Sequence, residues 1–453
     1  MTGDEGYKWG DKKFIPDLIG LDNTDAKPFA ELWIGAHPKA PARIKVKGTM
    51  IDFDKIIRGA AYEILGKDVS DKFSKKLPYL LKIITAQNSL SIQAHPDKKH
   101  AEAGFEKENI SGIDSNAYNR SYKDTNHKPE LICAITKFWV LNGFMAPMKI
   151  IDSFSLIDIP EIRKEFKIFK DKIKKSQNND TIQKKALKDF YSILMKDAGA
   201  KDKNGKERLR IKAIISHITN YAQNRIGKIL NIQGNCILKD AVARAAAAGK
   251  IDELKREIWT LKVNEQYKDD FGILAVYFLN LIQLQPGEAM YLPAGELHAY
   301  LGKLNPASPY EGAAVELMAN SDNVLRGGLT NKYIDVCELL NILTFTSAEP
   351  KIIFPLPAAC AERIYKTPAD EFELSIIELT GNQVFTSDIK HSADIFIVMK
   401  GFAEVTDARN NMLEIKKGGA FMVPAISGKY TIRSLDADSV LYKASVPISL
   451  SVC

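Results

Sequence analysis

The sequence predicts a mainly β protein with an α-helical insertion. Short apolar runs separated by turn residues fill both ends of the chain, which is typical of β-sandwiches and barrels. A central segment instead repeats its apolar residues at helical spacing. The pattern GEAMYLPA at 287–294 returns as GGAFMVPA at 418–425, and this echo favours two similar β domains.

Four segments follow from these patterns. Residues 1–149 mix short strands with turns, as in AELWIGAHPKAP. Residues 150–267 form the helical insertion, in which KALKDFYSILMKDA and IDELKREIWTL each carry an apolar face. Strand signals resume over 268–349, so this segment is expected to complete the domain that 1–149 begins. Residues 350–453 show short alternating runs and are expected to form the second β domain.

The composition is that of a globular protein of two or three domains, with 453 residues, 45% hydrophobic and 26% charged. The net charge of +7 is modest, and no nucleic-acid motif accompanies the basic segment 161–190, so nucleic acid is not an expected partner. No run approaches the roughly 20 apolar residues of a membrane helix. The five cysteines form no CxxC pair, which favours a reduced compartment. We expect a cytoplasmic monomer that acts on a small molecule.

The segment LSIQAHPDKKHAE alternates polar and apolar side chains. In an extended chain, Gln93 and His95 share one strand face, while Ile92 and Ala94 share the other. The polar face is suited to ligation and the apolar face to packing. Pro96 ends the strand.

Two further histidine motifs have the same character. In NHKPEL, His127 precedes Lys128 and Glu130, which are two residues apart and share a face. In PAGELHAYL, a glycine turn feeds a strand that presents His298 and Tyr300 together. Of the seven histidines, His95, His127 and His298 are the ones that these motifs single out. The others, His37, His100, His217 and His391, are expected to be ordinary core or surface residues.

Four of these side chains, Gln93, His95, Glu130 and His298, could converge inside one β domain. Two imidazoles, a carboxylate and an amide oxygen form a mixed nitrogen and oxygen set that suits Zn²⁺, while Mn²⁺, Fe²⁺ and Co²⁺ are alternatives. A mixed set of this kind leaves room for water or substrate, so the sequence favours a catalytic site over a structural one.

A second group of charged residues lies in VELMANSDNVLRGGLTNKYIDV, which contains Glu316, Asp322, Arg326 and Lys332. Arg326 and Lys332 could hold a phosphate or a developing oxyanion by charge-assisted hydrogen bonds. A surface loop with ordinary ion pairs is the alternative.

These motifs, with YKWGDKKFIPDLIGL and FAELWIGAHPKAP near the N-terminus, resemble the signature segments of type I mannose-6-phosphate isomerases (phosphomannose isomerases), a zinc-dependent cupin family. The resemblance runs through nearly the whole chain in the family's order. It implies two cupin (jelly-roll) β-barrel domains plus a helical subdomain. The C-terminal cupin-like domain is expected to hold no metal, because the second copy of the echo has Lys429 at the offset where the first has His298.

The resemblance also implies site residues. One Zn²⁺ per chain would be bound by Gln93, His95, Glu130 and His298. The residues assigned to catalysis are Arg326, Lys128, Glu316, Lys82, His127 and Asp322. The residues assigned to substrate binding are Ser91, Lys128, Tyr300, Arg326 and Lys332.

The implied reaction interconverts D-mannose 6-phosphate and D-fructose 6-phosphate through an enediol, with Lys128 or Glu316 as the base. One alternative is another metal-dependent cupin enzyme, an iron dioxygenase using His95, Glu130 and His298. A second is a non-catalytic cupin that binds sugar phosphates. A third, a bifunctional nucleotide-transferring enzyme, is disfavoured because no glycine-rich, basic nucleotide-binding loop lies near the N-terminus.

Overall fold

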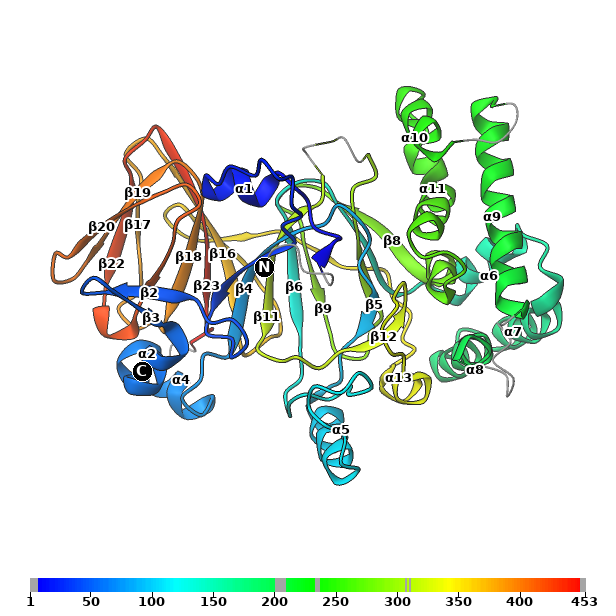
Figure 1. The fold of residues 1–453 in the computed structure, drawn as a ribbon, viewed down its shortest axis with the longest axis horizontal. Helices are drawn as coiled ribbons and strands as arrows, with labels where there is room; N and C mark the ends of the chain where they lie inside the picture. Colours follow the sequence, from blue (N-terminus) through cyan, green and yellow to red (C-terminus); the bar gives the residue numbers. More distant parts are fainter. Residues whose placement is uncertain (1–6, 200–208, 233–236, 306–307, 309–310, 449–453) are drawn as a thin grey trace.

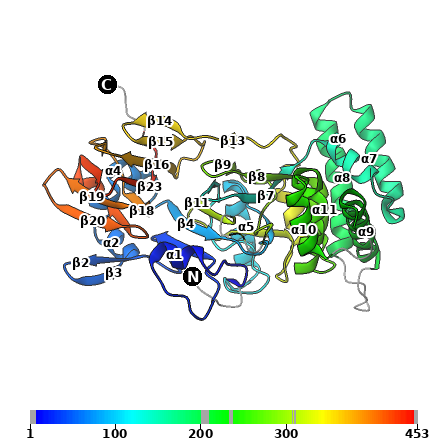
Figure 2. The ribbon, with the colours of Figure 1, turned by 90° about the horizontal axis from the view of Figure 1, so that it is seen from above.

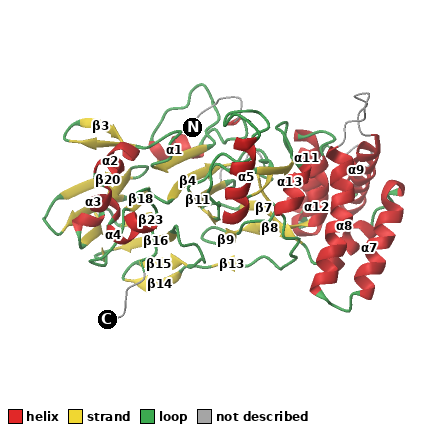
Figure 3. Cartoon of the chain, turned by 90° about the horizontal axis from the view of Figure 1, so that it is seen from below, coloured by secondary structure: helices red, strands yellow, loops and turns green. Residues whose placement is uncertain are grey.

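The computed structural model describes residues 7–199, 209–232, 237–305, 308 and 311–448. The fold combines α-helices with antiparallel β-sheets, and its layers lie side by side along the longest axis, with most of the helices gathered at one end (Figures 1 and 2). Figure 3 shows most of the helices at one end and a few short ones among the strands.

The first pair of sheets, called here the first sandwich, has the strand orders β1-β4-β11-β6-β9-β13 and β12-β5-β10-β7-β8. Ile132, Val140 and Tyr300 are among the buried side chains between the two sheets. The strands are β1 (Glu31–Gly35), β4 (Tyr79–Thr85), β5 (Ile92–Ala94), β6 (Glu130–Ala134), β7 (Phe138–Phe144), β8 (Leu279–Leu284), β9 (Ala289–Leu292), β10 (His298–Leu301), β11 (Ala313–Ala319), β12 (Leu325–Gly328) and β13 (Ile352–Ile353).

The second sandwich has the orders β14-β15-β16-β23-β18-β21 and β17-β22-β19-β20. Phe396, Ile432 and Leu441 lie in its core. The strands are β14 (Leu356–Ala359), β15 (Glu362–Tyr365), β16 (Glu373–Thr380), β17 (Val384–Thr386), β18 (Asp394–Lys400), β19 (Phe402–Asp407), β20 (Met412–Lys416), β21 (Ala420–Val423), β22 (Tyr430–Ser434) and β23 (Asp438–Ser445).

The two sandwiches repeat one strand order. β15-β16-β23-β18-β21 takes the place of β1-β4-β11-β6-β9, and β17-β22-β19-β20 takes the place of β5-β10-β7-β8. The echoed sequences fall on β9 and β21, which hold the same position in the two sheets. The residues paired with these strands also correspond. Leu292, which precedes a proline, pairs with Glu130, and Val423, which also precedes a proline, pairs with Asp394.

The two sandwiches pack back to back. Val315 of the first and Ala444 of the second belong to one buried cluster between the outer faces of their sheets. The Tyr79 hydroxyl, 2.8 Å from the Ala393 carbonyl oxygen and 2.9 Å from that of Ala444, links the halves in the same layer. The second sandwich therefore supports the sheet that carries β4, β6 and β11.

Helices cover the outer face of the β5-containing sheet. Trp139 of β7 packs against Trp259, with ring centroids 5.8 Å apart, inside a buried cluster that also holds Ile92 and Ala299. The helices are α6 (Pro147–Ser155), α7 (Arg163–Lys175), α8 (Asp180–Gly199), α9 (Leu209–Leu230), α10 (Leu238–Ala247), α11 (Ile251–Gln266) and α12 (Ala275–Phe278), with 3₁₀ turns η2 (Pro160–Ile162) and η3 (Phe271–Leu274).

Short elements complete the fold. They are α1 (Phe14–Ile19), the hairpin β2 (Arg43–Val46) and β3 (Thr49–Asp52), α2 (Phe53–Gly59), α3 (Ala61–Leu65), α4 (Lys67–Lys72), α5 (Lys98–Ile110), α13 (Val336–Ile342) and η4 (Ala425–Ser427). No helix in the described part of the chain combines the length and the apolar character needed to cross a membrane.

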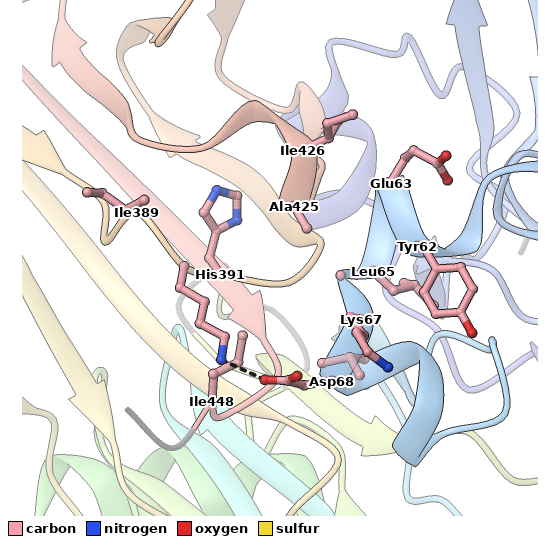
Figure 4. A pocket seen from close by; sticks show the side chains of 13 residues that line it. Tyr62, Glu63, Leu65, Lys67, Asp68, Ile389, His391, Ala425, Ile426 and Ile448 are labelled. Atoms are coloured by element: carbon pink, nitrogen blue, oxygen red, sulfur yellow. Dashed lines mark ion pairs between the residues drawn. The ribbon is translucent and has the colours of Figure 1, made fainter. Parts of the chain in front are cut away.

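Two segments cross the domain boundaries expected from the sequence. β13 lies beyond residue 350, but it pairs with β9 of the first sandwich. The helices α3 and α4 lie within 1–149, yet Tyr62 and Asp68 line a pocket of about 510 Å³ together with His391 and Ile426 of the second sandwich (Figure 4). Asp68 also forms an ion pair of 2.7 Å with Lys390.

Candidate active site

Three of the predicted metal ligands converge inside the first sandwich. The candidate ligand atoms of His95, Glu130 and His298 all lie within 4.8 Å of one another, and the three residues are buried. His95 Nε2 is 3.3 Å from one Glu130 carboxylate oxygen, and His298 Nε2 is 3.4 Å from the other. Glu130 opens β6 and His298 opens β10, so two facing sheets hold the ligands.

The hydrogen bonds of the two imidazoles fix which nitrogens face this centre. His95 Nδ1 lies 2.7 Å from the Asn323 carbonyl oxygen, and His298 Nδ1 lies 3.3 Å from that of Glu296. Each Nδ1 therefore donates a proton, and each Nε2 presents a lone pair to the Glu130 carboxylate. Neither Nε2 has a hydrogen-bond partner among the described residues. Lone pairs that face each other in a buried site require a cation between them, so these residues fit a metal ion.

Burial and neighbouring charge keep His95 and Glu130 in their metal-binding forms. Burial, with the nearby Lys128 ammonium, lowers the pKa of His95 to about 4, so its imidazole is neutral near neutral pH. Burial alone would raise the pKa of Glu130, but neighbouring charge, first that of the Lys128 ammonium, outweighs it and lowers that pKa well below its ordinary value. A neutral imidazole and an ionised carboxylate are the forms that bind metal.

The fourth predicted ligand lies in a row of polar residues across the β5-containing sheet. Gln93 pairs with His298 on one side and with Arg326 on the other, and Asn142 continues the row beyond His298. Ile92, on the opposite face of β5, packs in the core against the helices, so strand alternation turns Gln93 toward the interior of the sandwich. The structure thus brings Gln93 and Arg326 to the metal ligands.

A buried chain of charged and hydroxyl groups extends from Glu130. Lys128 Nζ lies 2.9 Å from one Glu130 oxygen. The Tyr300 hydroxyl donates to Glu316 over 2.8 Å and lies 3.4 Å from Glu130. Lys82 Nζ is 2.9 Å from the second Glu316 oxygen. The predicted residues Lys82, Lys128, Tyr300 and Glu316 are therefore parts of one network with the metal ligands.

This network has members that the sequence analysis did not assign. Glu31 and Trp33 of β1 lie beside Lys82, whose ammonium is 3.9 Å from a Glu31 oxygen and 5.1 Å from the Trp33 ring centroid. Burial lowers the pKa of Lys82, but the Glu31 and Glu316 carboxylates outweigh it and raise that pKa, so the ammonium stays charged. The signal was present in ELWIG, where Glu31 and Trp33 share a strand face.

Four cationic side chains lie near one another at the Arg326 end of this row of polar residues. Partial burial and the charges of Arg326, Lys123 and Lys39 lower the pKa of Lys332, and Lys123 responds in the same way to Lys39 and Arg326. Arg326 Nε is buried without a hydrogen-bond partner in the described part of the chain. We call Lys39, Lys123, Arg326 and Lys332 the cationic group. Such a group lowers its own repulsion by binding an anion.

Asp322 lies beside this cationic group, 2.9 Å from Lys39 Nζ and 3.6 Å from His37 Nε2. Ser91 is half-buried immediately before β5. His127 is placed differently, because its Nε2 is 2.6 Å from a carboxylate oxygen of Glu371 in the second sandwich. The structure therefore brings His37, expected to be an ordinary residue, to the site and turns His127 toward the domain interface.

Comparison with known proteins shows the family of this chain. Residues 2–146 match the family model of the phosphomannose isomerase type I catalytic domain. The mannose-6-phosphate isomerase of Escherichia coli (strain K12) is 32% identical over 437 residues, which cover 95% of this chain and 95% of that protein. The chain belongs to the mannose-6-phosphate isomerase family. The family member of Rattus norvegicus is 31% identical over 476 residues, covering 98% of this chain and 95% of that protein.

Solved structures of mannose-6-phosphate isomerases share the fold. A mutant of the Salmonella typhimurium phosphomannose isomerase has a TM-score of 0.78 and 29% identity, covering 99% of this chain and 98% of that chain. A zinc-bound mannose 6-phosphate isomerase has a TM-score of 0.76 at 29% identity, with the same coverage. The arrangement of sheets and helices therefore occurs in a family member that binds zinc.

Proposed function

We propose that this chain interconverts D-mannose 6-phosphate and D-fructose 6-phosphate with one Zn²⁺ held by Gln93, His95, Glu130 and His298. The observation that carries the proposal is the pair of buried imidazole Nε2 atoms, without hydrogen-bond partners in the described residues, that face the Glu130 carboxylate. Membership of the mannose-6-phosphate isomerase family supplies the reaction. Nitrogen and oxygen donors of this kind are ones that zinc accepts in catalytic sites.

We further propose that each sandwich is a cupin-type jelly roll, which the repeated strand order supports. We also propose that the chain divides into the units 1–149, 150–267, 268–349 and 350–453. The strand β13 lies within the last range but pairs with β9 of the first sandwich. We propose that the protein acts as a cytoplasmic monomer.

Aldose–ketose isomerisation moves a proton between neighbouring carbons through an enediol, whose negative oxygen needs stabilisation as it develops. When bound, zinc supplies Lewis-acid polarisation of the substrate oxygens. Arg326 adds fixed positive charge from the adjacent strand. Lys128 and Glu316 are the two candidate bases, and Lys82 with Tyr300 holds the Glu316 carboxylate in a fixed orientation.

The phosphate end of the substrate fits the cationic group. A phosphate ester carries negative charge and several acceptor oxygens, which suit Arg326 and the ammonium groups of Lys39, Lys123 and Lys332. Ser91 adds a hydroxyl donor near the start of β5. Holding the phosphate there converts binding energy into orientation of the reacting carbons. Neither an iron dioxygenase nor a simple metal site needs such a group.

Replacing Lys123 by alanine is expected to raise the KM for mannose 6-phosphate by about tenfold, a loss of about 1.4 kcal/mol of binding. The reason is that one ammonium of the cationic group is removed while the metal ligands stay in place. Steady-state kinetics and competition by inorganic phosphate measure the effect. Lys99→Ala removes an exposed lysine of α5 and serves as the control. An unchanged inhibition constant for phosphate would contradict the assignment.

The function itself is tested by a coupled assay for fructose 6-phosphate formed from mannose 6-phosphate. We expect activity that a chelator removes and that added zinc restores. A folded protein without activity at any metal loading would contradict the proposal. Iron content and oxygen uptake, measured on the same preparation, would then test the dioxygenase alternative.

A further inference from the structure

We propose that Asn323 is a positioning residue that fixes one zinc ligand and the phosphate-binding cations together. This inference rests on the proposed function, because zinc and the phosphate of the substrate are the two ligands concerned. Asn323 follows Asp322 in the segment between β11 and β12, and neither the motifs nor the family resemblance assigned it a role.

The backbone carbonyl of Asn323 orients His95. Its oxygen accepts a hydrogen bond of 2.7 Å from His95 Nδ1, which keeps the proton on that nitrogen and turns Nε2 toward Glu130. Asn323 is 0% exposed, so water does not compete for this carbonyl. The direction of the His95 lone pair therefore depends on where the backbone of Asn323 lies.

The side chain of Asn323 binds the backbone of the segment 123–126. Its Oδ1 accepts hydrogen bonds from the N–H groups of Lys123, over 2.6 Å, and Asp124, over 3.1 Å. Its Nδ2 donates to the carbonyl oxygens of Asp124, over 2.8 Å, and Asn126, over 2.9 Å. Both ends of the amide are thus satisfied, and the reversed amide would set N–H groups against N–H groups.

The segment depends on these hydrogen bonds. Residues 123–129 lie outside helices and strands, and Lys123 and Asn126 are exposed, so apolar packing does not hold the start of this stretch. Backbone groups that no sheet or helix pairs need other partners, and the Asn323 amide supplies them. The segment is therefore attached to the same residue that orients His95.

The attached segment carries groups of both ligand sites. Lys123, at its start, belongs to the cationic group, and its end leads through His127 to Lys128 and Glu130. On the other side of the attachment, the chain runs from Asn323 directly into β12 and Arg326. A shift of the Asn323 amide would therefore displace Lys123 and the partner of His95 together.

Ser321 reinforces the attachment. It is buried, and its Oγ lies 2.9 Å from an Asp124 carboxylate oxygen and 3.1 Å from the Asn126 carbonyl oxygen. The backbone N–H of Asp322 donates to the other Asp124 oxygen over 2.7 Å. The segments 321–323 and 123–126 are thus joined by several bonds, and the Asn323 side chain makes those to the backbone of Lys123.

A second buried asparagine provides a comparison. Asn280 of β8 is also buried, and its Nδ2 lies 3.1–3.3 Å from the carbonyl oxygens of Asn142, Gly143, Phe144 and Ala348. Both asparagines hold backbone groups inside the protein, but only Asn323 holds the segment that carries Lys123. An effect on phosphate binding therefore distinguishes positioning of the cationic group from a general structural role.

The test replaces Asn323 by alanine and measures binding, with no need for turnover. Isothermal titration calorimetry with inorganic phosphate gives the phosphate dissociation constant of the zinc-loaded enzyme, and competition with a chelator gives that of zinc. We expect the phosphate constant to rise about tenfold, as for loss of Lys123 itself. Zinc binding should weaken by about tenfold or more, the loss typical of removing a group that orients a metal ligand.

A double-mutant cycle with Lys123→Ala shows whether Asn323 acts through that lysine. Once Lys123 is absent, Asn323→Ala should weaken phosphate binding by less than about twofold further, because residues that act as a unit are not additive. A further weakening of about tenfold in the double variant would overturn the inference. Asn280→Ala is the matched control, which should lower thermal stability but leave the phosphate constant unchanged.

The outcomes separate this inference from the proposed function. Native phosphate and zinc constants in a folded Asn323→Ala enzyme would overturn the inference, as would an equal loss of phosphate binding in Asn280→Ala. If Asn323→Ala does not fold, Ser321→Ala takes its place and should raise both constants by about threefold. Unchanged constants in Ser321→Ala would then overturn the inference. An inactive native enzyme would instead refute the proposed function.

Discussion

Replacing His298 by alanine is expected to abolish zinc binding and isomerase activity together. The change leaves the Glu130 carboxylate and the His95 imidazole in a buried site with one nitrogen ligand removed. Losing a direct ligand should weaken zinc binding by more than about 100-fold, the upper range for changes that only disturb ligand orientation. Zinc content after dialysis and activity in the coupled assay are the two measurements.

A matched control is His217→Ala on α9, which removes a histidine 3.5 Å from Glu161, far from the metal ligands along the chain and in the helical segment. It should keep both zinc and activity. Full zinc content in a folded His298→Ala protein would exclude His298 as a ligand. Activity recovered by excess zinc would show that the remaining ligands suffice when the metal is abundant.

Replacing Arg326 by alanine is expected to lower kcat by about 10²- to 10³-fold, the loss typical of removing one group that stabilises a developing oxyanion. The zinc content should stay at the native level, because Arg326 lies next to Gln93 in the row and not among the imidazole and carboxylate ligands. Its buried Nε has no hydrogen-bond partner in the described residues, so the guanidinium is available to a ligand.

Arg326→Lys separates charge from shape, because it keeps the cation but loses the planar fork of donors. It should retain part of the activity. Arg363→Ala, which removes an exposed arginine paired with Glu378 in the second sandwich, is the control and should be as active as the native enzyme. A turnover within about twofold of native in Arg326→Ala would show that the arginine is only a structural residue of β12.

Local patterns predicted the parts of the site that a single strand carries. The alternation in LSIQAHP fixed which face of β5 holds Gln93, and the same reasoning applied to Lys128 with Glu130. Pairings between distant segments could not be read in this way. His37 contacts Asp322 only because the chain after β1 folds beside the segment before β12, and no local pattern encodes that approach.

The fold shows the same limit. Periodicity located the helical segment and the strand-rich ends, because each element carries its own apolar face. The contact between α3 or α4 and the second sandwich depends on tertiary packing between segments far apart in the sequence, as does the pairing of β13 with β9. His127 is an example, because its motif resembles a catalytic segment but its imidazole contacts Glu371 of the second sandwich.

The repeated strand order has a consequence for the metal requirement of the two halves. β23 holds the position in the second sandwich that β11 holds in the first. Glu316 of β11 pairs with Lys82, and Lys443 of β23 pairs with Ser375 at the corresponding point. The second sandwich therefore has an ammonium where the first has a carboxylate. Lys443 Nζ lies 2.5 Å from Glu362, and Asp394, which stands where Glu130 stands, accepts a hydrogen bond of 2.7 Å from Tyr430.

The second half therefore carries a fixed counter-ion, the Lys443 ammonium, for the buried Glu362 carboxylate. A covalently attached ammonium cannot be extracted by a chelator or diluted away, so the charge of Glu362 stays balanced whether or not metal is present. The first half has internal ammonium groups as well, Lys128 and Lys82, but its two imidazole Nε2 atoms have no hydrogen-bond partner among the described residues, and a diffusible metal ion is what they can bind. Metal depletion should then abolish the isomerase activity while the protein stays folded.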